Sequence, residues 1–164
     1  MLRPFLRTSF LALACLLLGA CGSHPSRSDA PLQAGTPRAD AANAVLFRAI
    51  ALVGTPYHFG GNTPLGGFDC SGLVGYVFQD AAGVTLPRTS RDMSEVKARK
   101  LDREDLQAGD LVFFADRRQI SHVGIYVGEL RFVHAPNTGG TVRLDRLDGA
   151  WWSEHFVYGK RVLN

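Results

Sequence analysis

The sequence has few of the residues from which disulfide-linked and metal-binding proteins are built. Only three of its 164 residues are cysteine and five are histidine. So few cysteines exclude the disulfide framework of a small secreted domain. His24 and His58 have no metal-ligating residues at the spacing of a metal site. We therefore expect neither a bound metal nor a cofactor.

Excess charge and long apolar runs are also absent from the sequence. The formal net charge is +3, and without Arg3 and Arg7 of the N-terminal segment it is +1. This balance gives no reason to expect nucleic acid or a polybasic membrane patch as a partner. The most apolar stretch, residues 10–18, is shorter than the roughly 20 residues that a membrane-spanning helix needs.

The first 20 residues have a cationic start followed by an apolar run, which is typical of a secretory signal. The run ends in Leu-Gly-Ala-Cys at residues 18–21, which resembles the lipobox of bacterial lipoproteins. The alternative is an ordinary signal peptide with a chance cysteine at its cleavage site. The lipobox implies acylation of Cys21 and a membrane anchor in the cell envelope. Gly22 follows, so in a Gram-negative host we expect the outer membrane, on the side facing the periplasm.

Residues 22–40 are rich in Ser, Pro, Gly, Ala and Asp, and Leu32 is their only large aliphatic residue. Such a composition is typical of a disordered tether. The sequence thus predicts a signal peptide over residues 1–20, the lipidated cysteine and its tether over 21–40, and one domain over 41–164. A domain of this size is large enough for one hydrophobic core.

Helical patterns come first in this domain and strand patterns follow. Apolar residues recur at helical spacing after Asp40, the expected N-cap, and again from Cys70 to Gly83. A loop rich in Gly and Pro separates these helices, and Ser90 is the expected cap of a short, charged helix that runs through Arg99. The segments that favour strands are 111–114, 123–127, 131–134, 141–144 and 156–162. This order predicts an α+β fold, with N-terminal helices packed on an antiparallel sheet of about five strands.

Cys70 is the one thiol that remains if Cys15 leaves with the signal and Cys21 carries lipid. It lies where a glycine-rich loop ends and a helix begins. A helix N-terminus lowers the pKa of a thiol, and the thiolate is the reactive form. The alternative from the residues alone is a small buried core residue.

Two histidines lie on segments that alternate as strands do. His122 is on the face opposite Val123 and Ile125, and His134 ends the following segment. A turn at Gly128-Glu129 would pair the two segments as a hairpin and bring both imidazoles together. One histidine can then act as a base while the other orients it.

Three blocks of sequence look like the signature blocks of the NlpC family. They are Phe-Asp-Cys-Ser-Gly-Leu at 68–73, Ser-His-Val-Gly-Ile-Tyr at 121–126 and Phe-Val-His-Ala at 132–135. Smaller blocks at 57–61, 86–90 and 109–114 agree, and the match covers roughly residues 43–163. The resemblance implies a papain-like fold and a cysteine peptidase that cuts the stem peptides of peptidoglycan.

The resemblance also implies roles for single residues. It makes Cys70 the nucleophile, His122 the general base and His134 the polar group that orients the base. Tyr57 matches a tyrosine whose hydroxyl serves the oxyanion, together with the backbone N–H of the cysteine. The residues expected to contact the substrate are Asp69, Ser71 and Arg88. Arg88 would bind a stem-peptide carboxylate, and Asp69 would either receive an ammonium group or cap the helix.

The resemblance thus implies a peptidoglycan endopeptidase whose partners are stem peptides and, through Cys21, a membrane. Two alternatives stay open. A papain-like core also hosts other acyl-transfer enzymes, such as amidases and acyltransferases. A cell-wall-binding lipoprotein that has lost its activity is the other alternative, and an intact Cys and His argue against it. Protein regulators are not identifiable from the sequence.

Overall fold

The computed structural model describes residues 35–137 and 139–163. Its first helix, α1 (Pro37–Ala51), begins earlier than the sequence predicts. The hydroxyl of Thr36 accepts a hydrogen bond from the Ala39 N–H at 3.2 Å, so Thr36 is the N-cap. Asp40, the predicted cap, lies instead within the first turn, where a carboxylate is favoured by the helix dipole. Residues 37–40, expected to be tether, are therefore helical.

The second helix, α2 (Cys70–Ala82), has the bounds that the sequence predicts. Asp69 caps its N-terminus, and Gly83 ends it with a φ of 66°, a left-handed conformation that favours glycine. The third helix, α3 (Ser90–Glu95), is capped by Thr89 and not by the predicted Ser90. It is also shorter than predicted, because the chain after Val96 becomes extended.

Six strands form one antiparallel sheet in the order β3-β8-β4-β5-β6-β7. They are β3 (Arg99–Leu101), β4 (Leu111–Asp116), β5 (Gln119–Gly128), β6 (Arg131–His134), β7 (Arg143–Arg146) and β8 (Phe156–Arg161). The α+β prediction is confirmed, but β3 was not expected. Its first residue, Arg99, was taken as the end of a helix, whereas it pairs with Arg161 of β8.

Three further short elements were not predicted. They are the hairpin of β1 (Asn62–Thr63) and β2 (Gly67–Phe68), the single 3₁₀ turn η1 (Arg103–Asp105) and the helix α4 (Ala150–His155). The hairpin lies inside the stretch expected to be loop. The turn between β5 and β6 also differs, because its central residues are Glu129 and Leu130, both with positive φ.

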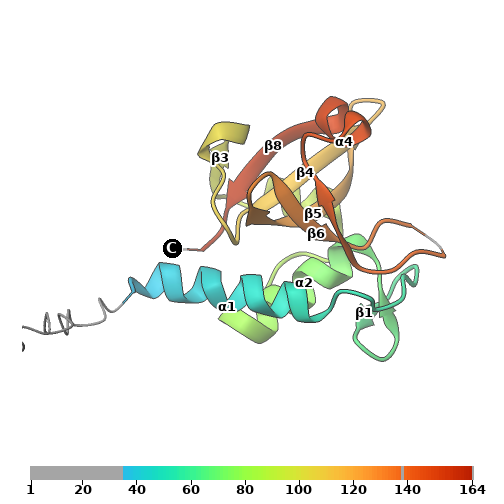
Figure 1. Ribbon diagram of the computed structural model, residues 1–164, viewed down its shortest axis with the longest axis horizontal. Helices are drawn as coiled ribbons and strands as arrows, with labels where there is room; N and C mark the ends of the chain where they lie inside the picture. Colours follow the sequence, from blue (N-terminus) through green and yellow to red (C-terminus); the bar gives the residue numbers. More distant parts are fainter. Residues whose placement is uncertain (1–34, 138, 164) are drawn as a thin grey trace, which may run out of the picture. The chain divides into compact units, whose positions relative to one another are not determined.

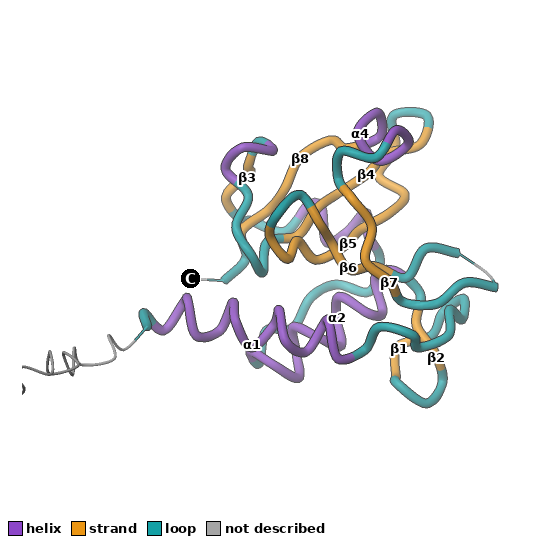
Figure 2. Tube along the Cα trace, in the orientation of Figure 1, coloured by secondary structure: helices purple, strands orange, loops and turns teal. Residues whose placement is uncertain are grey.

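The sheet has a hydrophobic core on each face. Leu111 and Phe113 of β4 pack on the side of α1 and α2, whereas Val112 and Phe114 pack on the side of α4. In Figure 1, α1 and α2 lie on one side of the sheet and α4 lies on the other. Figure 2 shows the strands in orange and the helices in purple in the same orientation. The start of α2 contacts the sheet at β5, where the backbone of Val123 faces Cys70.

The predictions for residues 1–20, for Cys21 and for most of the tether lie outside the described residues. Within the described ranges, no helix has the length and apolar character needed to cross a bilayer.

Candidate active site

Cys70, the candidate nucleophile, is the first residue of α2 and is partly exposed. It lines a cleft of about 510 Å³ whose walls come from the loop before α2, from the start of α3 and from β5. The residues around this cleft are Tyr57, Phe59, Gly60, Asp69, Cys70, Ser71, Arg88, Thr89, Ser90 and Ser121. Of the residues predicted to form the site, five thus share one cleft.

The charge state of Cys70 differs from the prediction. Burial, followed by the neighbouring carboxylate of Asp69, raises the pKa of the Cys70 thiol. Backbone N–H groups of Val123 and Ser71 act in the opposite direction and do not outweigh these two effects. The N–H groups at the helix start therefore lower the pKa of the thiol as predicted, but its net pKa is raised and not lowered. The thiol is protonated at rest and needs a base to remove its proton.

His122 and His134 are in direct contact, as the strand pattern predicts. Nε2 of His122 lies 2.9 Å from Nδ1 of His134. Gly124 makes this contact possible, because a Cβ there would lie 2.7 Å from the Phe132 ring and 3.4 Å from Cβ of His134. The backbone N–H of Val123, the next residue after His122, faces the Cys70 sulfur. Cys70, at the start of α2, therefore lies against β5 at the residue next to His122.

Aromatic rings enclose the two imidazoles. The Trp152 ring lies 5.4 Å from that of His122 and 4.7 Å from that of His134, measured between centroids. Phe132 packs on His134 as well, at 4.7 Å. Burial lowers the pKa of His122 to about 3 and that of His134 to about 4. Both imidazoles are thus neutral at physiological pH, and a neutral His122 has a free lone pair for a proton.

Asp145 of β7 is part of the same cluster, although nothing in the sequence pattern singled it out. Its Oδ2 atom lies 3.0 Å from Nε2 of His134 and accepts a hydrogen bond from Nε1 of Trp152, also at 3.0 Å. Arg143 donates to the same oxygen at 2.9 Å. The register of β6 on β7 pairs His134 with Arg143 and so places Asp145 diagonally across from His134. The sequence alone does not determine this register between β6 and β7.

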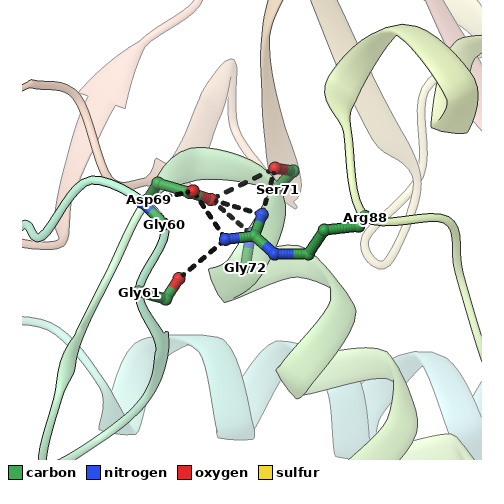
Figure 3. A network of polar contacts seen from close by, with 6 residues as sticks. All are labelled: Gly60, Gly61, Asp69, Ser71, Gly72 and Arg88. Carbon is green, nitrogen blue, oxygen red and sulfur yellow. Dashed lines mark hydrogen bonds and ion pairs between the residues drawn. The ribbon is translucent and has the colours of Figure 1, made fainter.

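Asp69, Ser71 and Arg88, the residues predicted to bind substrate, are bound to one another (Figure 3). Arg88 donates to both carboxylate oxygens of Asp69, at 2.9 and 2.7 Å, and to the Ser71 hydroxyl at 2.8 Å. Asp69 also accepts from the N–H groups of Gly60 and Gly72, at 3.0 and 2.7 Å. Burial acts to raise the pKa of Asp69, but the hydrogen bonds from Arg88 and Gly72 hold it below its usual value.

This network gives Asp69 a structural role. Its carboxylate caps α2 and holds the loop before the helix, as one of the two sequence interpretations expected. A substrate ammonium group would have to compete with Arg88 for it. Arg88 has a side chain that is 45 % exposed, so part of its guanidinium faces the cleft.

Tyr57 lines the same cleft. It precedes the loop to α2 and is paired with Phe68 by an isolated β-bridge. Burial raises the pKa of the Tyr57 hydroxyl, and the nearby Cys70 and Asp69 add to the effect. The phenol therefore keeps its proton and can donate a hydrogen bond to an anion in the cleft.

Among residues 35–137 and 139–163, no three His, Cys, Asp or Glu side chains are grouped so that they could hold a metal ion. The cleft itself offers a thiol and hydrogen-bond donors, and the neutral imidazole of His122 lies on the strand beside the thiol.

Residues 54–161 match the model of the NlpC/P60 family. Murein DD-endopeptidase MepH of Escherichia coli (strain K12) is 37 % identical over 126 residues, which cover 75 % of this chain and 46 % of MepH. The probable endopeptidase YafL of the same organism is 35 % identical over 159 residues, covering 85 % of this chain and 64 % of YafL. The chain therefore spans less than two thirds of the length of either relative.

Two solved structures of NlpC/P60 proteins have a similar fold. An NlpC/P60 family protein from Bacillus cereus ATCC 10987 has a TM-score of 0.70 and 30 % sequence identity, covering 75 % of this chain and 40 % of its own. The NlpC/p60 domain of the peptidoglycan hydrolase SagA has a TM-score of 0.66 and 29 % identity, covering 74 % of this chain and 98 % of that domain.

Proposed function

This chain belongs to the NlpC/P60 family, and we propose that it is a peptidoglycan endopeptidase with Cys70 as its nucleophile. Its substrates would be amide bonds within stem peptides or their cross-links. One observation carries the proposal. Cys70 lies at a helix start in the same cleft as Tyr57 and beside the strand of His122, whose ring is bonded to His134. The names of the relatives, two of them endopeptidases, support the reaction class.

The first half of the reaction forms an acyl-enzyme. Nδ1 of His122, the ring nitrogen not bonded to His134, takes the proton of the Cys70 thiol. The sulfur attacks the carbonyl carbon, an S–C bond forms, and the π electrons of the carbonyl move to its oxygen. Tyr57 and the backbone N–H of Cys70 stabilise this oxyanion. The C–N bond then breaks, and His122 gives its proton to the leaving amine.

The second half releases the product. Nδ1 of His122 takes a proton from water as the water oxygen bonds to the thioester carbon. The S–C bond breaks, and the proton returns from His122 to the sulfur. No group is oxidised or reduced in either half of the reaction.

Arg88 supplies charge recognition in this proposal. Stem peptides have free carboxylates, and the exposed part of the guanidinium lines the cleft while Asp69 holds its other side. Asp69 and Ser71 fix the position of Arg88, so the cation is already oriented before the substrate binds.

The test is hydrolysis of defined, cross-linked muropeptides, with the products identified by mass spectrometry. Wild type cleaves a peptide bond, and Cys70→Ala releases no product while keeping the same circular dichroism spectrum. Gly75→Ala is the matched control on α2, because its Cβ would touch only Met93, at 3.8 Å. Cleavage by Cys70→Ala at the wild-type rate would reject the mechanism.

We propose further that a lipid on Cys21 anchors the protein in the cell envelope, at the outer membrane and facing the periplasm in a Gram-negative host. Support comes from the lipobox-like residues 18–21 and from Gly22. Cys21→Ser should leave the protein without a fatty-acid label and outside the membrane fraction. Wild-type protein that carries no fatty-acid label and is wholly soluble would contradict the anchor.

A further inference from the structure

Two hydrogen bonds connect Asp145 to the candidate base. Oδ2 of Asp145 contacts Nε2 of His134 at 3.0 Å, and Nδ1 of His134 contacts Nε2 of His122 at 2.9 Å. Both ring nitrogens of His134 are therefore engaged, whereas His122 has Nδ1 left over. His134 is completely buried, so water does not compete for these contacts.

Asp145 can only accept at this position. Burial acts to raise the pKa of the Asp145 carboxyl, but hydrogen bonds from Arg143 and the contact with His134 hold it below its usual value. An ionised carboxylate has no proton to donate. The hydrogen between Asp145 and His134 must therefore be on Nε2 of His134.

The position of this hydrogen determines where the ring hydrogen of His122 lies. A neutral His134 with its hydrogen on Nε2 presents a lone pair at Nδ1. Nε2 of His122 must then donate to that lone pair and carry the hydrogen of its own ring. A neutral His122 with hydrogen on Nε2 has its lone pair on Nδ1.

We propose that Asp145 is a positioning residue that sets the tautomers of both histidines, so that Nδ1 of His122 is the only basic nitrogen offered to the Cys70 thiol. The proposal rests on the function proposed above. During catalysis the charge of Asp145 also stabilises the imidazolium that forms when His122 accepts the thiol proton. The chain of hydrogen bonds has three members, His122, His134 and Asp145, and Cys70 lies beside it, against the backbone N–H of Val123.

The carboxylate itself is held in place from two sides. Arg143 donates to Oδ2 through Nε and Nη2, at 3.2 and 2.9 Å, and Trp152 donates through Nε1 at 3.0 Å. Trp152 also packs on the rings of both histidines. Three N–H donors thus meet at Oδ2. In Asp145→Asn these donors would favour the amide oxygen at that position, so the variant keeps a hydrogen-bond acceptor and loses only the negative charge. Asp145→Leu removes the acceptor.

The comparison uses the full chain and these two variants, with Asp148→Asn as the control. Asp148 pairs with Arg146 at the same two-residue spacing as Asp145 with Arg143, but the hydrogen bonds of His122 and His134 do not include it. We expect kcat on muropeptides to fall about 10- to 100-fold in Asp145→Leu, the range of a lost hydrogen bond to a charged group, with a smaller fall in Asp145→Asn. Asp148→Asn should leave kcat unchanged.

Nitrogen-15 NMR of the imidazoles gives a readout that a merely structural role would not move. In wild type we expect both His122 and His134 as the tautomer with hydrogen on Nε2. In Asp145→Leu, His134 should lose this single tautomer. A wild-type His134 with hydrogen on Nδ1, or the same tautomers and kcat in Asp145→Leu, would overturn the proposal.

The spectrum of the wild type is informative even if a variant does not fold. It also separates the two proposals, because tautomers are observed without any substrate. If wild-type protein shows the expected tautomers but cleaves no muropeptide, the function fails and the role of Asp145 in setting the tautomers stands. If it cleaves muropeptides with the opposite tautomers, the role of Asp145 fails alone.

Discussion

The imidazole planes of His122 and His134 stand at 90° to each other, with their ring centroids 5.0 Å apart. In this arrangement one ring nitrogen of His134 points at one ring nitrogen of His122, at 2.9 Å. Only His122 has a nitrogen left for proton transfer, because His134 is bonded to Asp145 on its other side. The two histidines therefore have different roles, although both are buried in the same cluster.

Substitution of each histidine in turn should reveal this difference. We expect His122→Ala to abolish turnover, because it removes the nitrogen that takes the thiol proton. His134→Gln should retain part of the activity, since its amide oxygen can still accept from Nε2 of His122. Initial rates on a defined muropeptide check this order. Equal losses would mean that His134 does more than orient its neighbour.

Acid should destabilise the folded protein through the same pair. The pKa of His122 is about 3 and that of His134 about 4 in the folded state, against about 6.5 in an unfolded chain. Between these values the unfolded chain binds more protons, so stability is complete above pH 6.5 and is lost as the pH falls toward 4. Besides each other, the charged groups that act on these rings are Asp145 and Arg143, and the attraction of Asp145 is weaker than the effect of burial.

Urea denaturation at pH 7 and pH 5 measures this effect. The free energy of unfolding of wild type should fall by at most roughly 2 kcal/mol for each histidine between these pH values. His134→Gln should show a clearly smaller fall, because one of the two groups is gone. A fall of the same size in the variant would assign the acid sensitivity to other residues.

The sequence predicted the elements that follow local rules. Helix α2 has a cap at Asp69, a regular apolar face and Gly83 at its end, and each of these signals is local. The hairpin that carries both histidines follows from alternation along β5 and from the apolar residues of β6. These two elements were enough to predict Cys70, His122 and His134 as one group, and the structure brings both histidines to the point of β5 that faces Cys70.

The features that sequence could not predict depend on pairing between distant segments. Strand β3 is charged and is defined by its hydrogen bonds to β8, about sixty residues away. The partnership of Asp145 with His134 requires the register of β7 on β6. The raised pKa of Cys70 results from burial, which a helix-start argument does not include. Arg88 and Asp69 were assigned to opposite substrate charges because their mutual contact was not visible.

Gly124 should be intolerant of any side chain. Its Cβ would lie 2.7 Å from the Phe132 ring and 3.0 Å from the Val133 carbonyl oxygen, so the strand pair itself would have to move. We expect Gly124→Ala to cost about 1–3 kcal/mol of stability, as overpacking does, and to lower kcat by displacing His134. Thermal unfolding and initial rates check this, with Gly75→Ala as the tolerated exchange. Wild-type stability in Gly124→Ala would show that β6 adjusts freely.

Arg88 should act on substrate binding as well as on the loop that it holds. Its guanidinium contacts both oxygens of Asp69 in a geometry that a lysine ammonium cannot reproduce. Because Arg88 lines the cleft with an exposed side chain, we expect Arg88→Lys to raise KM for muropeptides with free carboxylates several-fold and to leave kcat nearly unchanged. The same variant should not change KM for muropeptides whose carboxylates are amidated.

Arg91→Lys is the control, since Arg91 is an exposed arginine close by in α3 that is absent from the cleft lining. If Arg88 only braces Asp69, its exchange will lower the melting temperature and alter KM equally for both substrates, because a shifted loop does not distinguish a carboxylate from an amide.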